Sequence, residues 1–260
     1  MIVVTTTTPP YAVRQTDHAA MAGRLAAWWP LERVPGLVDP TIRGLFIEAV
    51  RHHDDGWYGW EATPARDEAT GQPVDFKSIS TTDHIQIWKD SVDACAKRHP
   101  YIGLLVAKHA LSLYLKTLNT DNVNASRHTG YEHDVMVADA MAWLTERALE
   151  LDRRLRDVGE GWTRILNQID EHRRIFTVFD AFTLMMLGGV PRQDKIRIET
   201  DYQLGWIEGE RRVTLEPWPV NQFKPNLIAV ETLDGHTIEW SLEPAGHAET
   251  ASPSPRPVTA

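Results

Sequence analysis

The sequence predicts a mainly α protein with a small C-terminal antiparallel β segment. Apolar residues recur about every 3.6 positions from near residue 16 to residue 187, which is typical of helices that face a core. After Pro191 the period changes to two, which is typical of strands. Hydrophobic residues make up 42% and charged residues 24% of the 260 residues, as expected of a globular chain.

Capping residues and prolines mark the ends of the predicted helices. Asp39-Pro40, for example, combines an N-cap with a proline in the first helical position, and Gly188-Gly189 is a strong C-terminal signal. The helices predicted in this way begin near residues 16, 40, 83, 100, 132 and 163. A polar loop over residues 61–80 separates the second helix from the third.

The β segment is expected to contain short strands. They lie near residues 196–198, 213–215, 227–233 and 237–240, and Asp234-Gly235 predicts a hairpin turn between the last two. The chain thus divides into a helical domain (11–190), a β appendage packed on it (191–242) and a tail rich in Pro, Ser, Ala and Thr (243–260), which we expect to be disordered.

Charge and cysteine content exclude several classes of protein. The net charge of −9, from 27 basic and 36 acidic residues, argues against nucleic acid as a partner. The single cysteine, Cys95, excludes a disulfide framework and fits a reducing cytoplasm. No stretch approaches the roughly 20 apolar residues that span a bilayer, and the first ten residues lack the pattern of a signal peptide. We therefore expect a cytoplasmic protein without a membrane partner, and the oligomeric state stays open.

Four histidines are distributed over four predicted helices, at positions His18, His53, His84 and His109. The last three lie on apolar helix faces, where each one alone is explained most simply as a hydrogen-bonded core histidine. A buried imidazole needs a partner for both ring nitrogens, and a cluster of them needs something that holds the rings together. A metal ion does both, since neutral imidazole is the commonest metal ligand in proteins.

Two aspartates complete the candidate site. Asp54 directly follows His53, and neighbouring helical residues point about 100° apart, so this pair can straddle a site and the carboxylate can bridge two metals. Asp180 lies in the middle of the apolar run 176–182, where an unpaired carboxylate is costly. A salt bridge to Arg173 or Arg174 is the alternative for Asp180; metal ligation fits the other residues better.

These residues resemble the HD superfamily of helical metalloenzymes. The order His18, His53-Asp54, His84, His109, Asp180 resembles the ligand order of that superfamily, and His53-Asp54-Asp55-Gly56 resembles its H-D-x-G centre. More narrowly, Gln15-x-Asp17-His18, His53-Asp54-x-Gly56-Trp57 and Leu104-Leu105-Val106-x-x-His109 are similar to an uncharacterised bacterial domain family, over roughly residues 11–245.

The resemblance implies a helical HD bundle with two divalent metal ions, iron or manganese. His18, His53, Asp54 and Asp180 would hold the first ion, and His84 and His109 the second, with Asp54 bridging both. A second His-Asp pair, His133-Asp134, is interpreted as a surface or capping pair.

One position departs from the superfamily pattern. Many dinuclear HD enzymes carry a lysine directly after H-D-x-G, where it contacts substrate, whereas this chain has Trp57. Trp57, Tyr58 and Trp60 suit stacking on a base, a sugar or an apolar group at a pocket mouth. A core or lid cluster of aromatic residues is an equally weighted alternative.

The resemblance leaves three functions open. The first is hydrolysis of a phosphate ester or anhydride of a small molecule, with Asp54 at the catalytic centre and Arg14 and Lys108 offsetting phosphate charge. The second uses the same ligands in a mixed-valent di-iron oxygenase that consumes O2. The third is a non-catalytic module that binds a metal or ligand.

Overall fold

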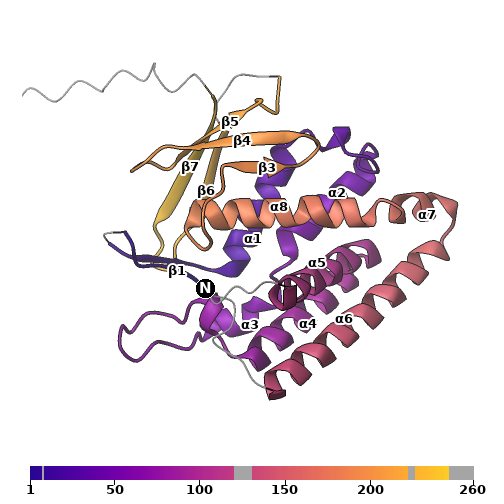
Figure 1. Cartoon of the computed structure of the whole chain (residues 1–260), viewed down its shortest axis with the longest axis horizontal. Helices are drawn as coiled ribbons and strands as arrows, with labels where there is room; N and C mark the ends of the chain where they lie inside the picture. Colours follow the sequence, from indigo (N-terminus) through magenta and orange to yellow (C-terminus); the bar gives the residue numbers. More distant parts are fainter. Residues whose placement is uncertain (8, 120–130, 222–225, 246–260) are drawn as a thin grey trace, which may run out of the picture.

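The computed structural model describes residues 1–7, 9–119, 131–221 and 226–245, and it is mainly helical (Figure 1). The helices are α1 (Gln15–Trp28), α2 (Pro40–His52), α3 (Trp57–Ala62), α4 (Thr81–Arg98), α5 (Pro100–Asn119), α6 (Tyr131–Arg156), α7 (Glu160–Leu166) and α8 (Ile169–Leu187), with short 3-10 turns at Leu31–Arg33 and Phe76–Ser78. No helix in the described ranges is long and apolar enough to cross a membrane.

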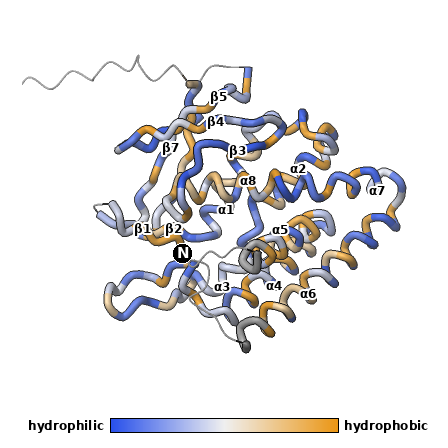
Figure 2. The backbone as a smooth tube through the Cα atoms, in the orientation of Figure 1, coloured by the Kyte–Doolittle hydropathy of each residue, from blue (hydrophilic) through white to orange (hydrophobic). Residues whose placement is uncertain are grey.

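Helices α1, α2, α5 and α8 form the packed centre of the molecule. Helix α1 packs on α2 and α8, and α5 packs on α2 and α8 on one side and on α4 and α6 on the other. In Figure 2 α5 is mostly hydrophobic, and α8 is hydrophilic at the end next to α7 and hydrophobic toward its other end. Phe176, Phe179 and Phe182 of α8 are fully buried, so this helix supplies much of the core.

Two expected helices differ in the structure: the second is shorter than expected and the last is divided. The second ends at His52, and a turn over residues 53–56 leads into the separate helix α3. The last expected helix is broken between α7 and α8, where Gln168 leaves helical geometry (φ −105°, ψ 3°). The predicted C-terminal stop is confirmed, since the cap residue Gly188 has a left-handed φ of 76°.

The C-terminal sheet is mixed, which corrects the prediction of an antiparallel segment. Its strands are β3 (Lys195–Arg197), β4 (Asp201–Trp206), β5 (Arg212–Glu216), β6 (Asn226–Glu231) and β7 (Thr237–Pro244), in the order β3-β4-β5-β7-β6. The expected hairpin at Asp234-Gly235 is confirmed by antiparallel pairing of β6 with β7. However, β7 returns beside β5 in parallel, and it also extends two residues into the tail predicted from residue 243. Residues 246–260 lie outside the described ranges.

A short N-terminal hairpin, β1 (Ile2–Val4) with β2 (Tyr11–Val13), joins the helices to the sheet. Val13 forms an isolated bridge with Thr232, next to strand β6. Aromatic contacts then connect the two layers, because Trp29 at the end of α1 lies 4.9 Å from Tyr202 and Phe182 of α8 lies 6.2 Å from Trp206. One hydrophobic core therefore runs through both the helices and the sheet.

Candidate metal centre

Five buried side chains from four separate segments converge between the central helices. They are His18 of α1, His53 and Asp54 of the turn after α2, His109 of α5 and Asp180 of α8, with exposed fractions of 7% or less. All five belong to the set of six ligands expected from the sequence. Burial of two carboxylates with three imidazoles demands a balance of charge inside the site.

The turn after α2 places His53 and Asp54 side by side. His53 is the C-cap of α2 and keeps helical geometry, and the amide of Trp57 donates to the Asp54 carbonyl over 2.9 Å. Gly56 lets this turn approach α4 closely, since a Cβ there would lie 2.1 Å from the carbonyl oxygen of Ile87. The glycine of the H-D-x-G motif is therefore required by packing rather than by an unusual φ, which is −63°.

Helix α1 is capped by a carboxylate from another helix. The residue before α1, Arg14, makes no side-chain cap, but the amide of Gln15 and the hydroxyl of Thr16 both donate to the buried carboxylate of Glu61 in α3. These bonds satisfy donors of the first turn and fix the helix that carries His18. Sequence reasoning does not identify Glu61, because nothing in its local sequence marks a capping role across 45 residues.

Both carboxylates lie within 3.2–3.6 Å of imidazole nitrogens. Asp180 places Oδ1 3.4 Å from His18 Nε2 and 3.6 Å from His53 Nε2, and its Oδ2 3.3 Å from His109 Nε2. Asp54 Oδ2 lies 3.2 Å from His53 Nε2 and 3.5 Å from His18 Nδ1. One ligand atom each of His18, His53 and Asp180 lies within 4.8 Å of the others, so these three residues form a cluster that can hold a metal ion.

Hydrogen bonds fix which nitrogen of His109 carries the proton. Thr177 Oγ1 donates to the carbonyl of Arg173 over 3.0 Å, so its hydrogen is used, and at 3.0 Å from His109 Nδ1 it accepts from that nitrogen. The pKa of His109 is lowered by burial, which keeps the ring neutral and its Nε2 without a proton. This bare Nε2 has no hydrogen-bond partner within the described chain, yet it lies 3.3 Å from Asp180 Oδ2.

His53 shares with His109 only the supporting bond at Nδ1. Its Nδ1 donates to the carbonyl of Val50 over 2.8 Å, so Nε2 faces the carboxylates of Asp54 and Asp180. Metal-binding histidines almost always donate their second nitrogen to a carbonyl or another acceptor in this way. Fully partnered His172 provides a contrast: its Nε2 donates to the Pro35 carbonyl and its Nδ1 accepts from Tyr101, which is the pattern of an ordinary core histidine.

The site is electrostatically coupled. Burial raises the pKa of Asp54, but His53 and His18 outweigh burial and bring that pKa down to about 2. Burial also raises the pKa of Asp180, and the neighbouring imidazoles of His109 and His53 outweigh burial and bring it well below its usual value. Burial lowers the pKa of His53, but Asp54 and Asp180 raise it well above its usual value. Both carboxylates are thus ionised at neutral pH, and the site favours a cation among them.

His84 lines the same cavity but is turned away from the cluster. The indole of Trp88 donates to its Nε2 over 3.1 Å, so Nδ1 carries the proton and donates to the hydroxyl oxygen of Tyr114 over 3.2 Å. Burial lowers the pKa of His84 to about 4, which keeps it neutral. In this arrangement the lone pair of His84 is already used, so it is the one predicted ligand whose nitrogen is not directed at a carboxylate.

The cavity above the cluster is small and largely apolar apart from the ligands. Its volume is about 70 Å³. It is lined by Gln15, His18, His53, Asp54, Trp57, Phe76, His84, Trp88, His109, Leu113, Asp180 and Leu184. A water molecule occupies about 30 Å³, so this space suits an ion with about two waters rather than a whole metabolite. No lysine or arginine occurs among the described lining residues.

The other predicted site residues are distributed differently. Arg14 pairs with Asp17 over 3.4 Å at the start of α1, and Lys108 pairs with Asp170 over 2.8 Å; neither lines the cavity. Lys108 is next to His109 in the sequence, but adjacent helical residues point in different directions.

The three aromatic residues after the motif separate in the structure. Trp57 is buried and lines the cavity, whereas Tyr58 is 60% exposed and Trp60 packs edge-on against Trp57 at 5.5 Å. The side chains of the second His-Asp pair, His133-Asp134, lie outside the part of the chain that the structure describes.

The fold and the cluster define a mainly helical protein with a site that can hold a metal ion. The chain belongs to the family described as "Protein of unknown function (DUF3891)", whose model matches residues 1–232. The expected membership of an uncharacterised family is thereby confirmed, while the HD superfamily stays a prediction. No curated protein and no solved structure matches the chain.

Proposed function

We propose that this chain is a metal-dependent enzyme of the HD-superfamily type. The observation that carries the proposal is the neutral His109, whose bare Nε2 lies 3.3 Å from an ionised oxygen of Asp180. Two lone pairs at that distance repel each other unless a cation lies between them. The unpartnered Nδ1 of His18, 3.5 Å from Asp54, supports the same conclusion.

His18, His53, Asp54 and Asp180 would hold the first ion, with His109 in reach of Asp180. To bind a second ion, His84 would have to give up the hydrogen bond that its Nε2 accepts from Trp88 and coordinate the metal with that nitrogen. Imidazole and carboxylate ligands suit iron and manganese, among other divalent ions.

The reaction we propose first is hydrolysis of a phosphate ester or anhydride of a small molecule. A bound divalent ion supplies Lewis acidity and lowers the pKa of a coordinated water. Within the chain, Asp54 and Asp180 stay ionised and provide hydrogen-bond acceptors and negative charge for a cation, while Trp57 and Phe76 line the cavity as apolar walls. Since the cavity is about 70 Å³, the substrate enters by displacing these aromatic side chains or reacts at the mouth.

A di-iron oxygenase that consumes O2 is the second candidate. It is favoured by the lining, which in the described residues contains no cationic side chain to receive a phosphate and presents Trp57, Phe76 and Trp88 instead. Such a lining suits an uncharged or apolar substrate.

Elemental analysis of protein purified without chelators tests the proposal. We expect one or two ions per chain in the wild type and His236→Ala, whose imidazole is exposed, and loss of metal in His53→Ala and Asp180→Asn. Iron with substrate-dependent O2 consumption would identify the oxygenase, and turnover of phosphate esters without O2 the hydrolase. A wild type that folds normally, binds no added iron or manganese and matches its His53→Ala variant would overturn the proposal.

A further inference from the structure

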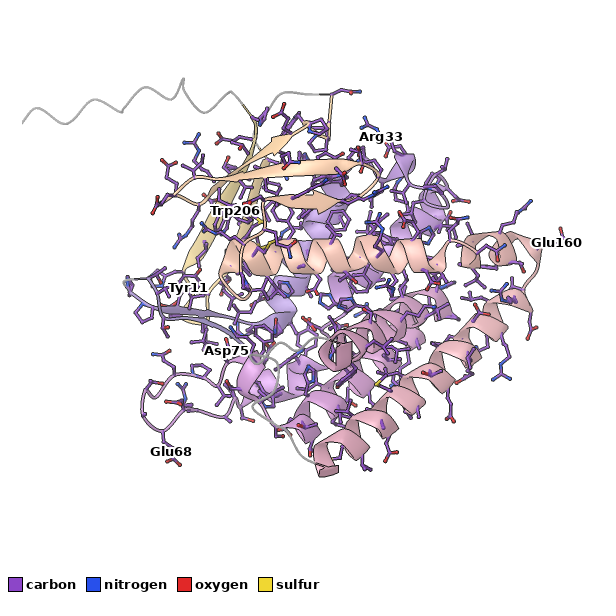
Figure 3. The ribbon with its side chains drawn as sticks, viewed as in Figure 1. Tyr11, Arg33, Glu68, Asp75, Glu160 and Trp206 are labelled. Carbon is purple, nitrogen blue, oxygen red and sulfur yellow. The ribbon has the colours of Figure 1, made fainter. Side chains whose placement is uncertain are left out.

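A second, larger pocket lies at the junction of the N-terminal hairpin with the C-terminal sheet. Its volume is about 620 Å³, within the range of small-molecule sites. It is lined by Val4, Thr6, Thr7, Tyr11, Met186, Gly188, Arg192, Gly209, Glu210, Arg211, Arg212 and Trp240. None of these residues lines the metal cavity, so the two sites are distinct. Figure 3 shows Tyr11 and Trp206 on the side of the molecule where α8 ends.

Two arginines from different loops converge on this pocket. Arg192, after α8, stacks over Trp206 at 4.8 Å and lies 5.8 Å from the ring of Trp240, and Arg211, in the turn before β5, lies 5.9 Å from the ring of Tyr11. Both arginines and Tyr11 line this pocket, and both guanidinium charges lower the pKa of the Tyr11 hydroxyl, which burial raises. Aromatic stacking orients each guanidinium plane and leaves its N–H groups for a ligand.

These two arginines lack carboxylate partners within the described ranges. Arg212 provides the contrast, because it pairs with Glu210 over 2.8 Å and with Glu243 over 2.7 Å. Glu210, the acidic residue in the lining, is thus already engaged. The pocket is therefore a local positive site on a chain of net charge −9.

One residue of the lining has an unpaired buried donor. Trp240 is only 3% exposed, and its indole N–H has no hydrogen-bond partner within the described residues. A buried indole N–H usually finds a partner, because leaving it unpaired costs free energy. The nitrogen itself has less than 1 Å² of accessible surface, so the pocket does not expose this donor to a ligand.

We propose that this pocket binds the phosphate group of a small molecule. Arg192 and Arg211 supply forked, permanently charged donors, and Thr6 and Thr7 also line the pocket. A phosphate offers three terminal oxygens to such a set, and guanidinium groups bind it with paired hydrogen bonds. The remaining volume, lined in part by Val4 and Met186, accommodates the rest of the molecule.

Isothermal titration with inorganic phosphate and pyrophosphate at low ionic strength tests this inference. We expect saturable binding to the wild type, weakened about tenfold or more in Arg192→Ala and in Arg211→Ala, since each loses charge-assisted hydrogen bonds. Arg164→Ala, which removes an exposed arginine of α7 outside the pocket, is the matched control and should bind like the wild type.

The same titration on His53→Ala separates the pocket from the metal centre. Binding that persists in this variant belongs to the pocket, whether or not the proposed enzyme activity is correct. Binding that is lost in His53→Ala, or that survives unchanged in both arginine variants, would overturn the inference, as would the absence of saturable binding to the wild type.

Discussion

At the scale of single residues, the candidate metal site depends on side chains that are not themselves proposed to bind the metal. Thr177 is the clearest case, because its hydroxyl decides which nitrogen of His109 carries the proton. Such supporting bonds set the ring orientation and the basicity of the ligand nitrogen. The sequence does not reveal them, since a threonine in an apolar helix has no distinctive local pattern.

Thr177→Val keeps the shape of the side chain and removes the acceptor for His109 Nδ1. We expect metal affinity to fall about 10- to 100-fold, the range found when such supporting partners are lost. Competition with a fluorescent chelator measures the change. Thr145→Val is the matched control, because Thr145 also bonds the carbonyl four residues before it but has no histidine partner, and its affinity should stay at the wild-type value. Equal affinities in the two variants would contradict the role of Thr177.

His84 gives a prediction for pH in the metal-free protein. Its pKa is about 4 in the folded state, because burial disfavours the charged ring, against an ordinary 6.5 in the unfolded chain. Between these values the unfolded chain binds more protons, so stability falls as the pH drops from 6.5 to 4. The difference in unfolding free energy between wild type and His84→Gln should shift by up to about 3 kcal/mol over this window, to the disadvantage of the wild type. Urea unfolding of both proteins at several pH values, with chelator present, measures this difference. A difference in unfolding free energy that does not change with pH would refute the prediction.

At the scale of elements, the turn between α2 and α3 carries the motif and depends on contact with α4. Gly56 lies against the backbone at Ile87 and Ser91, and the Ser91 hydroxyl accepts from its amide over 3.0 Å. Any side chain at this position has to push α4 away. Glycine is therefore required at position 56 because the turn between α2 and α3 packs directly against α4, not because of the conformation of the turn itself.

Gly56→Ala should destabilise the protein by about 2–3 kcal/mol, because a methyl group there overpacks the backbone of α4. Gly59→Ala is the control in the neighbouring helix α3: no packing neighbour lies within 4 Å of the position that the new methyl group would take, and alanine favours helices over glycine. It should be neutral or stabilising by up to about 1 kcal/mol. Thermal unfolding of both variants measures these changes. A similar loss of stability in Gly56→Ala and Gly59→Ala would contradict the argument that Gly56 is required for the close approach to α4.

The local part of the architecture follows from the sequence, and the non-local part does not. Capping signals at Asp39-Pro40 and Gly188-Gly189, and the turn at Asp234-Gly235, depend on neighbouring residues and are found in the structure. The parallel pairing of β5 with β7 is not predictable in this way, because it depends on where the chain returns after residues 217–225. The short hairpin β1–β2 escapes prediction because three-residue strands leave little periodicity to detect.

The candidate site divides in the same way. Five of the six proposed ligands come together. Helical periodicity predicts inward positions only for His53, His84 and His109, and the full set follows from the resemblance to the HD superfamily. Arg14 and Lys108 are close to ligands in sequence only, and their side chains instead pair with Asp17 and Asp170. Direction along a helix, not distance along the chain, determines these outcomes.

At the scale of the whole molecule, the cluster ties together segments that are far apart in sequence. Its members come from α1, the turn after α2, α5 and α8, the helices at the centre of the single core. An ion that binds these side chains only in the folded protein stabilises the whole fold by mass action. Metal binding and global stability should therefore be linked.

Removal of metal should lower the melting temperature by roughly 5–10 °C. The estimate follows from about 2.7 kcal/mol of stabilisation at a free ion concentration about 100 times Kd, with about 2–4 °C per kcal/mol for a chain of this size. Calorimetry with and without chelator measures the shift. His53→Ala, which lacks a ligand, should melt at the same temperature in both buffers.

The reactivity of Cys95 toward an alkylating reagent is a second measure of how metal binding affects unfolding. Its thiol is fully buried between α4 and α2, donates to the His52 carbonyl over 3.2 Å, and burial raises its pKa to about 12. The native protein should therefore react with iodoacetamide only when it opens. Because chelation increases the population of open molecules, alkylation of Cys95 should accelerate with chelator in the wild type and not in His53→Ala. An unchanged rate together with an unchanged melting temperature, in wild-type protein stripped of a bound metal, would show that the ion does not connect the helices.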